Sequence, residues 1–316
     1  MTDFQRYLRA KQTVDDRALD RRLLDRLREA LADRAAAADG PLSVLEVGAG
    51  IGTMISRLIE WDVLPAGEIE YTAVDVQQEN VDAVPEHLRA WATDRPEVVA
   101  VDGDGKLVLR GPERRVTVRA VADDGVAYAE RAAAGEIDGG GRGAYDLLIG
   151  AALLDILDLD GLGALLGALD PGGLWYFPIT FDGATRFRPA HPADRAIERR
   201  YHDHMDRKPG GSSRAGGDTL ERLRGVEGAS LLGVAGSDWI VRPVEGDYPG
   251  DEAYFLGHIL DTVESAVGEV AEEDFEELGP WLRRRRAQLD AAELTYHTHQ
   301  LDFLGRVDEP AVRRGG

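Results

Sequence analysis

A glycine-rich segment that follows an apolar run is the part of this sequence best suited to bind a ligand. Residues 43–53 read SVLEVGAGIGT, in which Gly48, Gly50 and Gly52 stand at every second position. This pattern predicts a buried parallel strand that passes into a helix through a turn, with backbone free of Cβ atoms lying close to the bound group. We expect Glu46, two residues before the first glycine, to suit a ligand that carries an amino group near this turn.

Two further acids follow apolar runs in a similar way. Asp75 ends an apolar run 23 residues after Gly52, and Asp123 follows a third run. In an open α/β sheet the carboxyl ends of neighbouring parallel strands border one crevice. Carboxylates placed there can accept hydrogen bonds from the two hydroxyl groups of a ribose and from the amino group of an adenine. Each acid alone is equally compatible with a solvated loop, but the three acids together indicate an adenosyl ligand.

The spacing of the glycines separates two classes of cofactor. A dinucleotide-binding turn has the pattern G-x-G-x-x-G, whose last glycine allows the helix to pack closely on the strand. In this chain the sixth position is Thr53, and an acid at Glu46 does not belong to that pattern. A NAD-dependent oxidoreductase is therefore the less favoured alternative.

With these features the chain resembles the class I S-adenosylmethionine-dependent methyltransferases. The resemblance extends over about residues 43–180, in the order of the family. It is carried by the segments VLEVGAGIG, YTAVDV, VAD, YDLLI and LDPGG, which begin at Val44, Tyr71, Val121, Tyr145 and Leu169. It implies a doubly wound, Rossmann-like α/β fold: a mostly parallel seven-stranded sheet with an antiparallel last strand, plus a helical cap or insertion.

The resemblance also implies a cofactor, S-adenosyl-L-methionine. Glu46 and the glycines would hold its methionine end, Asp75 its ribose and Asp123 its adenine. The predicted cofactor-binding residues are Glu46, Gly48, Ala49, Gly50, Gly52, Asp75, Val76, Asp123 and Gly150. Methyl transfer from a sulfonium depends mainly on alignment, which can supply about 7–11 kcal/mol of the barrier. Because no catalytic side chain is obligatory, a non-catalytic module that only binds the cofactor remains an alternative.

Hydrophobic periodicity predicts the elements that position this site. Helices are expected over residues 4–11, 15–38, 52–61, 78–93, 160–169, 220–224, 253–270 and 272–289. Strands are expected over 43–48, 70–75, 116–121, 145–150, 174–179, 231–241 and 294–304, with a hairpin over 98–110 and a glycine-rich loop near 139–143. We divide the chain into an N-terminal helical cap (1–40), the cofactor-binding core (41–180), a substrate-side insertion (181–217) and a remainder with two cap helices (218–316). Tyr7 and Lys11 are expected to cap the sheet rather than to close over a cofactor.

The insertion carries the candidate catalytic residues. Tyr201, His202 and His204 are candidates for a general base, which methyl transfer needs only when the acceptor is a hydroxyl or a protonated amine. Because the two histidines are two positions apart, at most one of them is expected to point inward. A polar surface helix explains this segment equally well, and no metal site is predicted. The candidates for an apolar acceptor pocket are Tyr176, Phe177, Phe181, Phe187 and Trp239.

Missing motifs narrow the acceptor. Residues 150–153 read GAAL, which is not the Asn/Asp-Pro-Pro-aromatic motif of enzymes that methylate amino groups of adenine or glutamine. The chain has no cysteine, which excludes disulfides, thiolate zinc sites and covalent methylation of cytosine. A small-molecule methyl acceptor remains, and neither a nucleic-acid nor a membrane partner is expected. The oligomeric state is not indicated.

The charge composition points to the environment of the protein. There are 58 acidic and 37 basic residues, a net charge of −21, and only three of the basic residues are lysines. An acidic, lysine-poor composition is typical of haloarchaeal-type, halophilic proteins, in which concentrated salt screens the self-repulsion. An acidic protein with arginine-rich codon usage is the alternative. The charged N-terminus does not look like a secretory signal, and no apolar run approaches about 18 residues, so we expect a cytoplasmic protein.

Overall fold

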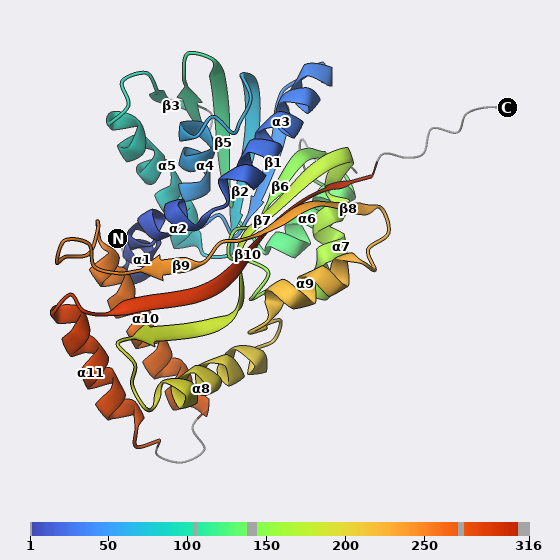
Figure 1. The fold of residues 1–316 in the computed structure, drawn as a ribbon. Coiled ribbons are helices and arrows are strands. Elements are labelled where there is room, and N and C mark those ends of the chain that lie inside the picture. Colours follow the sequence, from blue (N-terminus) through green and yellow to red (C-terminus); the bar gives the residue numbers. More distant parts are fainter. Residues whose placement is uncertain (1, 104–105, 138–143, 271–274, 309–316) are drawn as a thin grey trace.

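The computed structural model describes residues 2–103, 106–137, 144–270 and 275–308. The strands are β1 (Leu42–Val47), β2 (Gly67–Asp75), β3 (Val99–Gly103), β4 (Lys106–Arg110), β5 (Arg114–Ala122), β6 (Tyr145–Ile149), β7 (Leu169–Arg188), β8 (Ala229–Gly236), β9 (Trp239–Val241) and β10 (Thr295–Val307). The helices are α1 (Asp3–Ala10), α2 (Gln12–Ala18), α3 (Arg21–Ala37), α4 (Thr53–Glu60), α5 (Gln78–Thr93), α6 (Gly125–Ala133), the 3-10 helix η1 (Leu159–Gly161), α7 (Leu162–Gly167), α8 (Asp194–Arg207), α9 (Ala215–Leu223), α10 (Glu252–Val270) and α11 (Leu278–Asp290). Strands and helices alternate over much of the chain, as the sequence predicts (Figure 1).

All strands join one sheet of order β3-β4-β5-β2-β1-β6-β7-β10-β8, and β9 pairs with β10. β5, β2, β1, β6 and β7 are parallel, whereas β10 runs antiparallel between β7 and β8. The mostly parallel sheet with an antiparallel last strand is thus confirmed. The predicted hairpin is also present, and its strands β3 and β4 extend the β5 edge, so the sheet is larger than the seven strands expected. The tip of this hairpin (104–105) and most of the glycine-rich loop near 139–143 lie outside the described residues.

Apolar side chains bury both faces of this sheet. Along β1, Val44 belongs to the hydrophobic cluster that includes residues of α3, α4 and α5. Leu45 and Val47 belong to a second cluster, which includes residues of α6, α7 and α9. Because successive side chains of a strand point to opposite faces, the continuous apolar run of β1 serves both clusters. This is the doubly wound arrangement.

The helix predicted over residues 15–38 is divided into α2 and α3. Asp20 causes the break, because its carboxylate accepts hydrogen bonds from the backbone N–H groups of Arg22 and Leu23. A side chain that satisfies these N–H groups begins a new helix rather than continuing the old one. The strand predicted over 231–241 is likewise divided, into β8 and β9, and the N–H of Ser237 between them donates to the carbonyl of Gln300.

β7 changes the predicted organisation most. It extends over 20 residues and crosses the expected boundary at residue 180, because β10 pairs with it from Leu174 to Arg188. The strand also begins earlier than the predicted residue 174, at Leu169, and the insertion begins only with α8. Figure 1 shows the paired strands β7 and β10 leaving the upper sheet and entering the lower half, where α8, α10 and α11 lie. The cap is therefore built on strands of the sheet itself.

The ribbon formed by β7 and β10 bends at Ile179. The φ angle of this residue is 59°, a left-handed conformation that β-branched residues rarely adopt. The buried carboxylate of Asp302 on β10 holds the bend, because it accepts the N–H of Ile179 (2.8 Å) and that of Asp20 (2.9 Å). The pairing of β10 with β7 shifts register beside it, between Leu301 and Phe303. Such strain persists where the surrounding structure over-determines it, as it does here.

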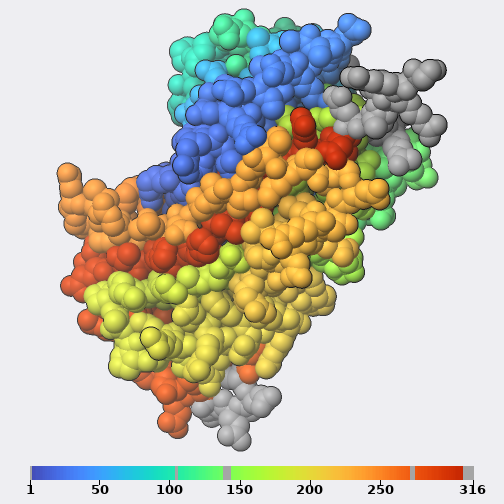
Figure 2. All heavy atoms as spheres, turned by 45° about the vertical axis from the view of Figure 1, so that its right-hand side comes forward, coloured from blue at the N-terminus to red at the C-terminus, as the bar shows by residue number. Residues whose placement is uncertain are grey.

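The N-terminal helices connect the two halves. α2 packs against β9, α3 against β8 and β10, and α1 against α10. Figure 2 shows these helices in blue beside the orange segment that contains β8 and β9. Among the described residues, no helix is both long and apolar enough to cross a membrane.

Candidate active site

A cavity of about 1060 Å³ lies at the carboxyl ends of the parallel strands. One part of its wall consists of the turn after β1, the residues that follow β2 and the residues that follow β5. The other part consists of α1, the loop after β6, the bend in β7, and side chains of α8, α10 and β10. The position of the cavity agrees with the crevice expected for an open α/β sheet.

The glycine turn has the backbone that its sequence predicts. Gly48, Gly50 and Gly52 all have positive φ angles, of 71°, 54° and 84°. Gly48, Ala49 and Gly50 line the cavity, whereas Gly52 lies behind them as the residue that precedes α4. A Cβ on Gly50 would lie 3.2 Å from the side chain of Leu8 on α1. The turn therefore faces the cavity, and α1 packs closely against it at Gly50.

Gly150 has a packing role in this structure. It is not among the residues that line the cavity. A Cβ at this position would lie 2.6 Å from Leu153 and 3.0 Å from Phe177, so a larger residue would require these side chains to shift. Its proposed contact with a cofactor has no support from this geometry.

Asp75 braces the glycine turn as well as facing the cavity. Its Oδ2 accepts the N–H of Gly50 at 2.8 Å, and its Oδ1 accepts the N–H of Gln77 at 2.9 Å and the side-chain amide of Asn80 at 3.1 Å. The next residue, Val76, lines the cavity and leaves 69% of its surface exposed. A carboxylate with spare acceptor capacity thus stands beside an uncovered apolar side chain, which suits a ribose next to a flat ring.

Asp123 also lines the cavity, on the far side of Asp75 from β1. Its backbone N–H donates to the carbonyl of Asp75 at 3.1 Å, which joins the two strand ends. Its carboxylate accepts the N–H of Asp124 at 2.9 Å and forms an ion pair with Arg131. The acid is in the predicted place, but part of its hydrogen-bonding capacity is already used.

Glu46 is buried at the end of β1 and faces the cavity. Only 2% of its surface is exposed, and its Oε2 accepts a hydrogen bond from the hydroxyl of Tyr71 at 2.8 Å. Burial raises the pKa of Glu46 to about 8, although Tyr71 and the charge of Arg57 act in the opposite direction. A carboxyl group in this state gains from a cationic partner, because a nearby positive charge favours its ionised form.

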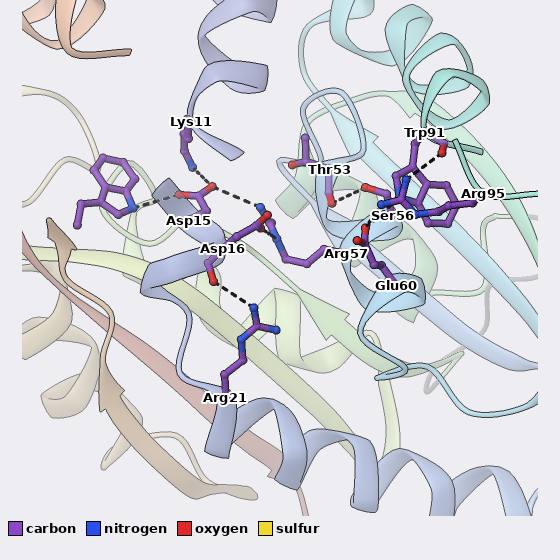
Figure 3. A network of polar contacts seen from close by, with 11 residues as sticks. Lys11, Asp15, Asp16, Arg21, Thr53, Ser56, Arg57, Glu60, Trp91 and Arg95 are labelled. Atoms are coloured by element: carbon purple, nitrogen blue, oxygen red, sulfur yellow. Dashed lines mark hydrogen bonds and ion pairs between the residues drawn. The ribbon is translucent and has the colours of Figure 1, made fainter. Parts of the chain in front are cut away.

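Arg57 on α4 supplies a positive charge at the same wall. It is 3% exposed, and its Nε donates to Asp16 at 2.6 Å. Its Nη2 is buried without a hydrogen-bond partner and lies 3.9 Å from a carboxylate oxygen of Asp15 (Figure 3). A buried guanidinium nitrogen of this kind is costly unless an acceptor reaches it. Glu46 and Arg57 together match the ammonium and carboxylate groups of an amino acid, so the residues present fit S-adenosylmethionine.

Helix α1 covers the cavity, contrary to the role expected for it. Tyr7 and Lys11 both line the cavity, and the Tyr7 ring stacks on His258 of α10 with ring centroids 4.2 Å apart. Gln5 donates to the carbonyl of Glu79 on α5, at 2.8 Å. On the other side, α1 is tied to α10 through an ion pair between Arg6 and Asp251, at 3.0 Å. The helix thus bridges the cofactor side and the cap.

The candidate catalytic residues of α8 point in different directions. Tyr201 lines the cavity. The Nε2 of His202 lies 2.9 Å from the hydroxyl of Thr185, and His204 pairs with Glu269 at 2.9 Å. Neither histidine is among the cavity-lining residues of the described chain. Of the aromatic candidates, Phe181 and Trp239 line the cavity, whereas Tyr176, Phe177 and Phe187 are buried in the core.

Several lining residues were missed by sequence reasoning, namely Arg57, Asp155, Tyr296 and Gln300. Arg57 carried a signal, since it is the one basic residue in the apolar helix TMISRLIE. Asp155 lies in the segment LLDILDLD, where neighbouring acids conceal it.

No family model and no curated protein matches the chain. Among solved structures, it is similar to a SAM-dependent methyltransferase from Geobacter sulfurreducens in complex with S-adenosyl-L-homocysteine, with 11% identity, 92% of each chain covered and a TM-score of 0.41. It is also similar to a putative sarcosine dimethylglycine methyltransferase from Galdieria sulphuraria, with 14% identity, coverage of 90% of this chain and 86% of that one, and a TM-score of 0.37. A third is phosphoethanolamine N-methyltransferase 2 from Haemonchus contortus, with 13% identity, 90% of this chain covered and a TM-score of 0.38; the match spans 52% of that longer protein. At these values the similarity carries no argument about function, which rests on the cavity.

Proposed function

We propose that the protein is a class I S-adenosylmethionine-dependent methyltransferase that acts on a small molecule. The observation that carries the proposal is the set of charged groups around the glycine turn. Asp75 reaches both the turn and the cavity, while Glu46 and Arg57, whose Nη2 lacks a hydrogen-bond partner, place a carboxyl group and a guanidinium in the wall of the same cavity. An adenosyl group joined to an amino acid satisfies all three residues.

Each of these residues has a role in holding the cofactor. Asp75 would accept hydrogen bonds from the ribose, and Val76 would cover one face of the adenine, with Asp123 near its amino group. Glu46 would bind the ammonium group and Arg57 the carboxylate. When bound, the cofactor supplies an activated methyl group on a sulfonium. The remaining cavity wall would align the acceptor and exclude water, which is the main requirement of such a transfer.

Binding of the cofactor is the direct test of this proposal. The folded protein is expected to bind S-adenosylmethionine and its demethylated product in calorimetry, and to show no comparable heat with NAD. A folded sample that binds neither adenosyl compound would contradict the proposal. Release of demethylated cofactor upon addition of a metabolite extract would separate an enzyme from a module that only binds.

We further propose that the protein is a halophilic, haloarchaeal-type cytoplasmic protein, as its net charge of −21 suggests. The Debye length falls from about 10 Å at 0.1 M salt to about 3 Å at 1 M, so added KCl screens the self-repulsion. The melting temperature is therefore expected to rise by more than about 10 °C between 0.1 M and 3 M KCl. Sucrose at the same osmolality serves as the uncharged control. A melting temperature that stays constant or falls with KCl would contradict this prediction.

A further inference from the structure

The wall of the cavity beyond the glycine turn contains a carboxylate of which one oxygen lacks a hydrogen-bond partner. Asp155 lines the cavity from the loop after β6, and its Oδ1 is buried without a hydrogen-bond partner. The loop is held in place, because the backbone carbonyl of Asp155 accepts the N–H of Ser212 at 3.2 Å. Burial raises the pKa of Asp155 to about 6, which reflects a carboxylate that is only partly compensated. A cationic group next to it would remove this cost.

Three tyrosines from separate elements line the same cavity as this carboxylate, and the charge of Asp155 acts on two of them, Tyr7 and Tyr201. Tyr7 comes from α1, Tyr201 from α8 and Tyr296 from β10, and all three line the cavity. Burial raises the pKa of Tyr201 to about 12, and the charge of Asp155 adds to the effect. Burial likewise raises the pKa of Tyr7, and the charge of Asp155 contributes there as well. In the described part of the chain, the hydroxyls of Tyr7 and Tyr201 have no hydrogen-bond partner, so they are available to a ligand.

The cation whose charge acts on Asp155 is engaged elsewhere. The positive charge of Lys11 acts to lower the pKa of Asp155, but its ammonium group donates a hydrogen bond to Asp15 at 2.9 Å. Asp15 also accepts a hydrogen bond from the indole of Trp239 at 3.0 Å. Lys208 also lines the cavity, but its charge is not among the causes of the raised pKa of Asp155. The guanidinium of Arg57 is bound to Asp16. Asp15 and Asp16 are thus compensated, whereas Asp155 is not.

We propose that Asp155 and the hydroxyls of Tyr7, Tyr201 and Tyr296 bind the amino group of a small amine, and that this amine is the methyl acceptor. The inference rests on the proposed function and names its substrate class. An ammonium group has three N–H donors and no acceptor, which matches a carboxylate and tyrosine oxygens. The aromatic rings beside it add a favourable interaction with a cation. A carboxylate or phosphate ligand would instead be repelled by Asp155.

The groups at this site account for the proton and the electron pairs that move during the methyl transfer. The bound ammonium first gives one proton to the Asp155 carboxylate. The freed nitrogen lone pair then forms the new bond to the methyl carbon, while the electrons of the broken carbon–sulfur bond remain on sulfur. Asp155 is therefore proposed both to bind the amine and to accept its proton, a role for which His202 and His204 are not placed.

Three probes of similar shape and different charge test the inference. Phenethylamine is cationic at pH 7.5, 2-phenylethanol is neutral and phenylacetate is anionic. Their affinities are to be measured by calorimetry on the full chain saturated with S-adenosylhomocysteine, all in the same salt. The amine is expected to bind at least about tenfold more tightly than the alcohol, and the carboxylate most weakly. Equal or tighter binding of the alcohol or the carboxylate would overturn the inference, whatever variants show.

A matched pair of variants tests whether the preference for the amine depends on Asp155. Asp155→Asn is expected to reduce the affinity for phenethylamine about tenfold and to leave the affinities for 2-phenylethanol and S-adenosylhomocysteine within about twofold. Asp160→Asn makes the same change on the surface, where the side chain is 82% exposed and pairs with Arg222, and is expected to alter none of the three. An unchanged preference for the amine in the Asp155→Asn protein would overturn the inference. Failure of wild-type protein to bind S-adenosylhomocysteine would overturn the proposed function instead, because amine binding is also measurable without cofactor.

Discussion

Replacement of Asp75 by alanine is expected to reduce the affinity for S-adenosylhomocysteine about 100-fold. Hydrogen bonds to a charged group contribute about 1.5–3 kcal/mol each, and two ribose hydroxyls would lose their acceptor. The structure adds a second consequence, since Asp75 also accepts the N–H groups of Gly50 and Gln77. The free energy of unfolding is therefore expected to fall by about 2 kcal/mol, measured by urea denaturation, while calorimetry gives the affinity.

A cofactor analogue separates these two effects of Asp75. The 2′-deoxy form of S-adenosylhomocysteine lacks one hydroxyl. Wild-type protein should therefore bind it more weakly than the parent compound, whereas the Asp75→Ala protein should bind the two compounds with equal affinity. Asp82→Ala is the control, because Asp82 is an exposed acid on α5 that accepts a hydrogen bond from Gln78 at 2.7 Å and does not line the candidate site. A 2′-deoxy penalty that is the same in wild type and variant would show that Asp75 braces the turn without binding the ribose.

Glu46→Gln is expected to change the pH dependence of stability. Burial raises the pKa of Glu46 from an ordinary 4.5 to about 8, so the folded protein keeps a proton that the unfolded chain loses above about pH 4.5. This stabilisation is complete below pH 4.5 and is lost as the pH rises to 8, at about 1.4 kcal/mol per pH unit. The variant lacks the slope but can still accept the hydrogen bond of Tyr71. Its stability relative to wild type should increase by about 4 kcal/mol across this range.

The same carboxyl group should release a proton when the cofactor binds. At pH 6.5 Glu46 is protonated in the free protein, and a bound ammonium group would favour its ionised form. Calorimetry in two buffers with different ionisation enthalpies is expected to show release of nearly one proton in wild type and close to none in Glu46→Gln. Glu79→Gln, an exposed acid at the rim of the cavity, should behave as wild type. Equal proton release in the two variants would exclude Glu46 as the ammonium ligand.

The part of the cavity around the glycine turn was predictable because its signals are local. The turn that contains Gly48 and Gly50 follows its strand directly, and Asp75 and Asp123 each end or follow an apolar run. Their meeting then follows from a general property of parallel sheets. Gly150 was the exception, since nothing in its neighbourhood revealed that Leu153 and Phe177 would pack against it.

The part of the cavity around Asp155 could not be predicted because distant segments build it. Tyr7, Asp155, Tyr201 and Tyr296 come from α1, the loop after β6, α8 and β10, and no spacing along the chain connects them. The length of β7 was hidden for a similar reason. Residues 180–188 read TFDGATRFR, which has neither a continuous apolar run nor a regular alternation, and only pairing with β10 makes them a strand. His202 and His204 were predicted from their residue type alone, but in the structure their ring nitrogens contact Thr185 and Glu269.

The bent ribbon of β7 and β10 limits how this protein can be engineered. A chain cut near residue 180 would lose β10 as well as the cap, and β7 would become an unpaired edge prone to aggregation. The cap is therefore not a module that can be exchanged for that of another protein. A change in the ligands that the cavity accepts has to come from single side chains that face the cavity from the ribbon, such as Ile179, Phe181, Tyr296 and Gln300. Substitutions at Ile179 carry an added condition, since any replacement must accept its left-handed backbone.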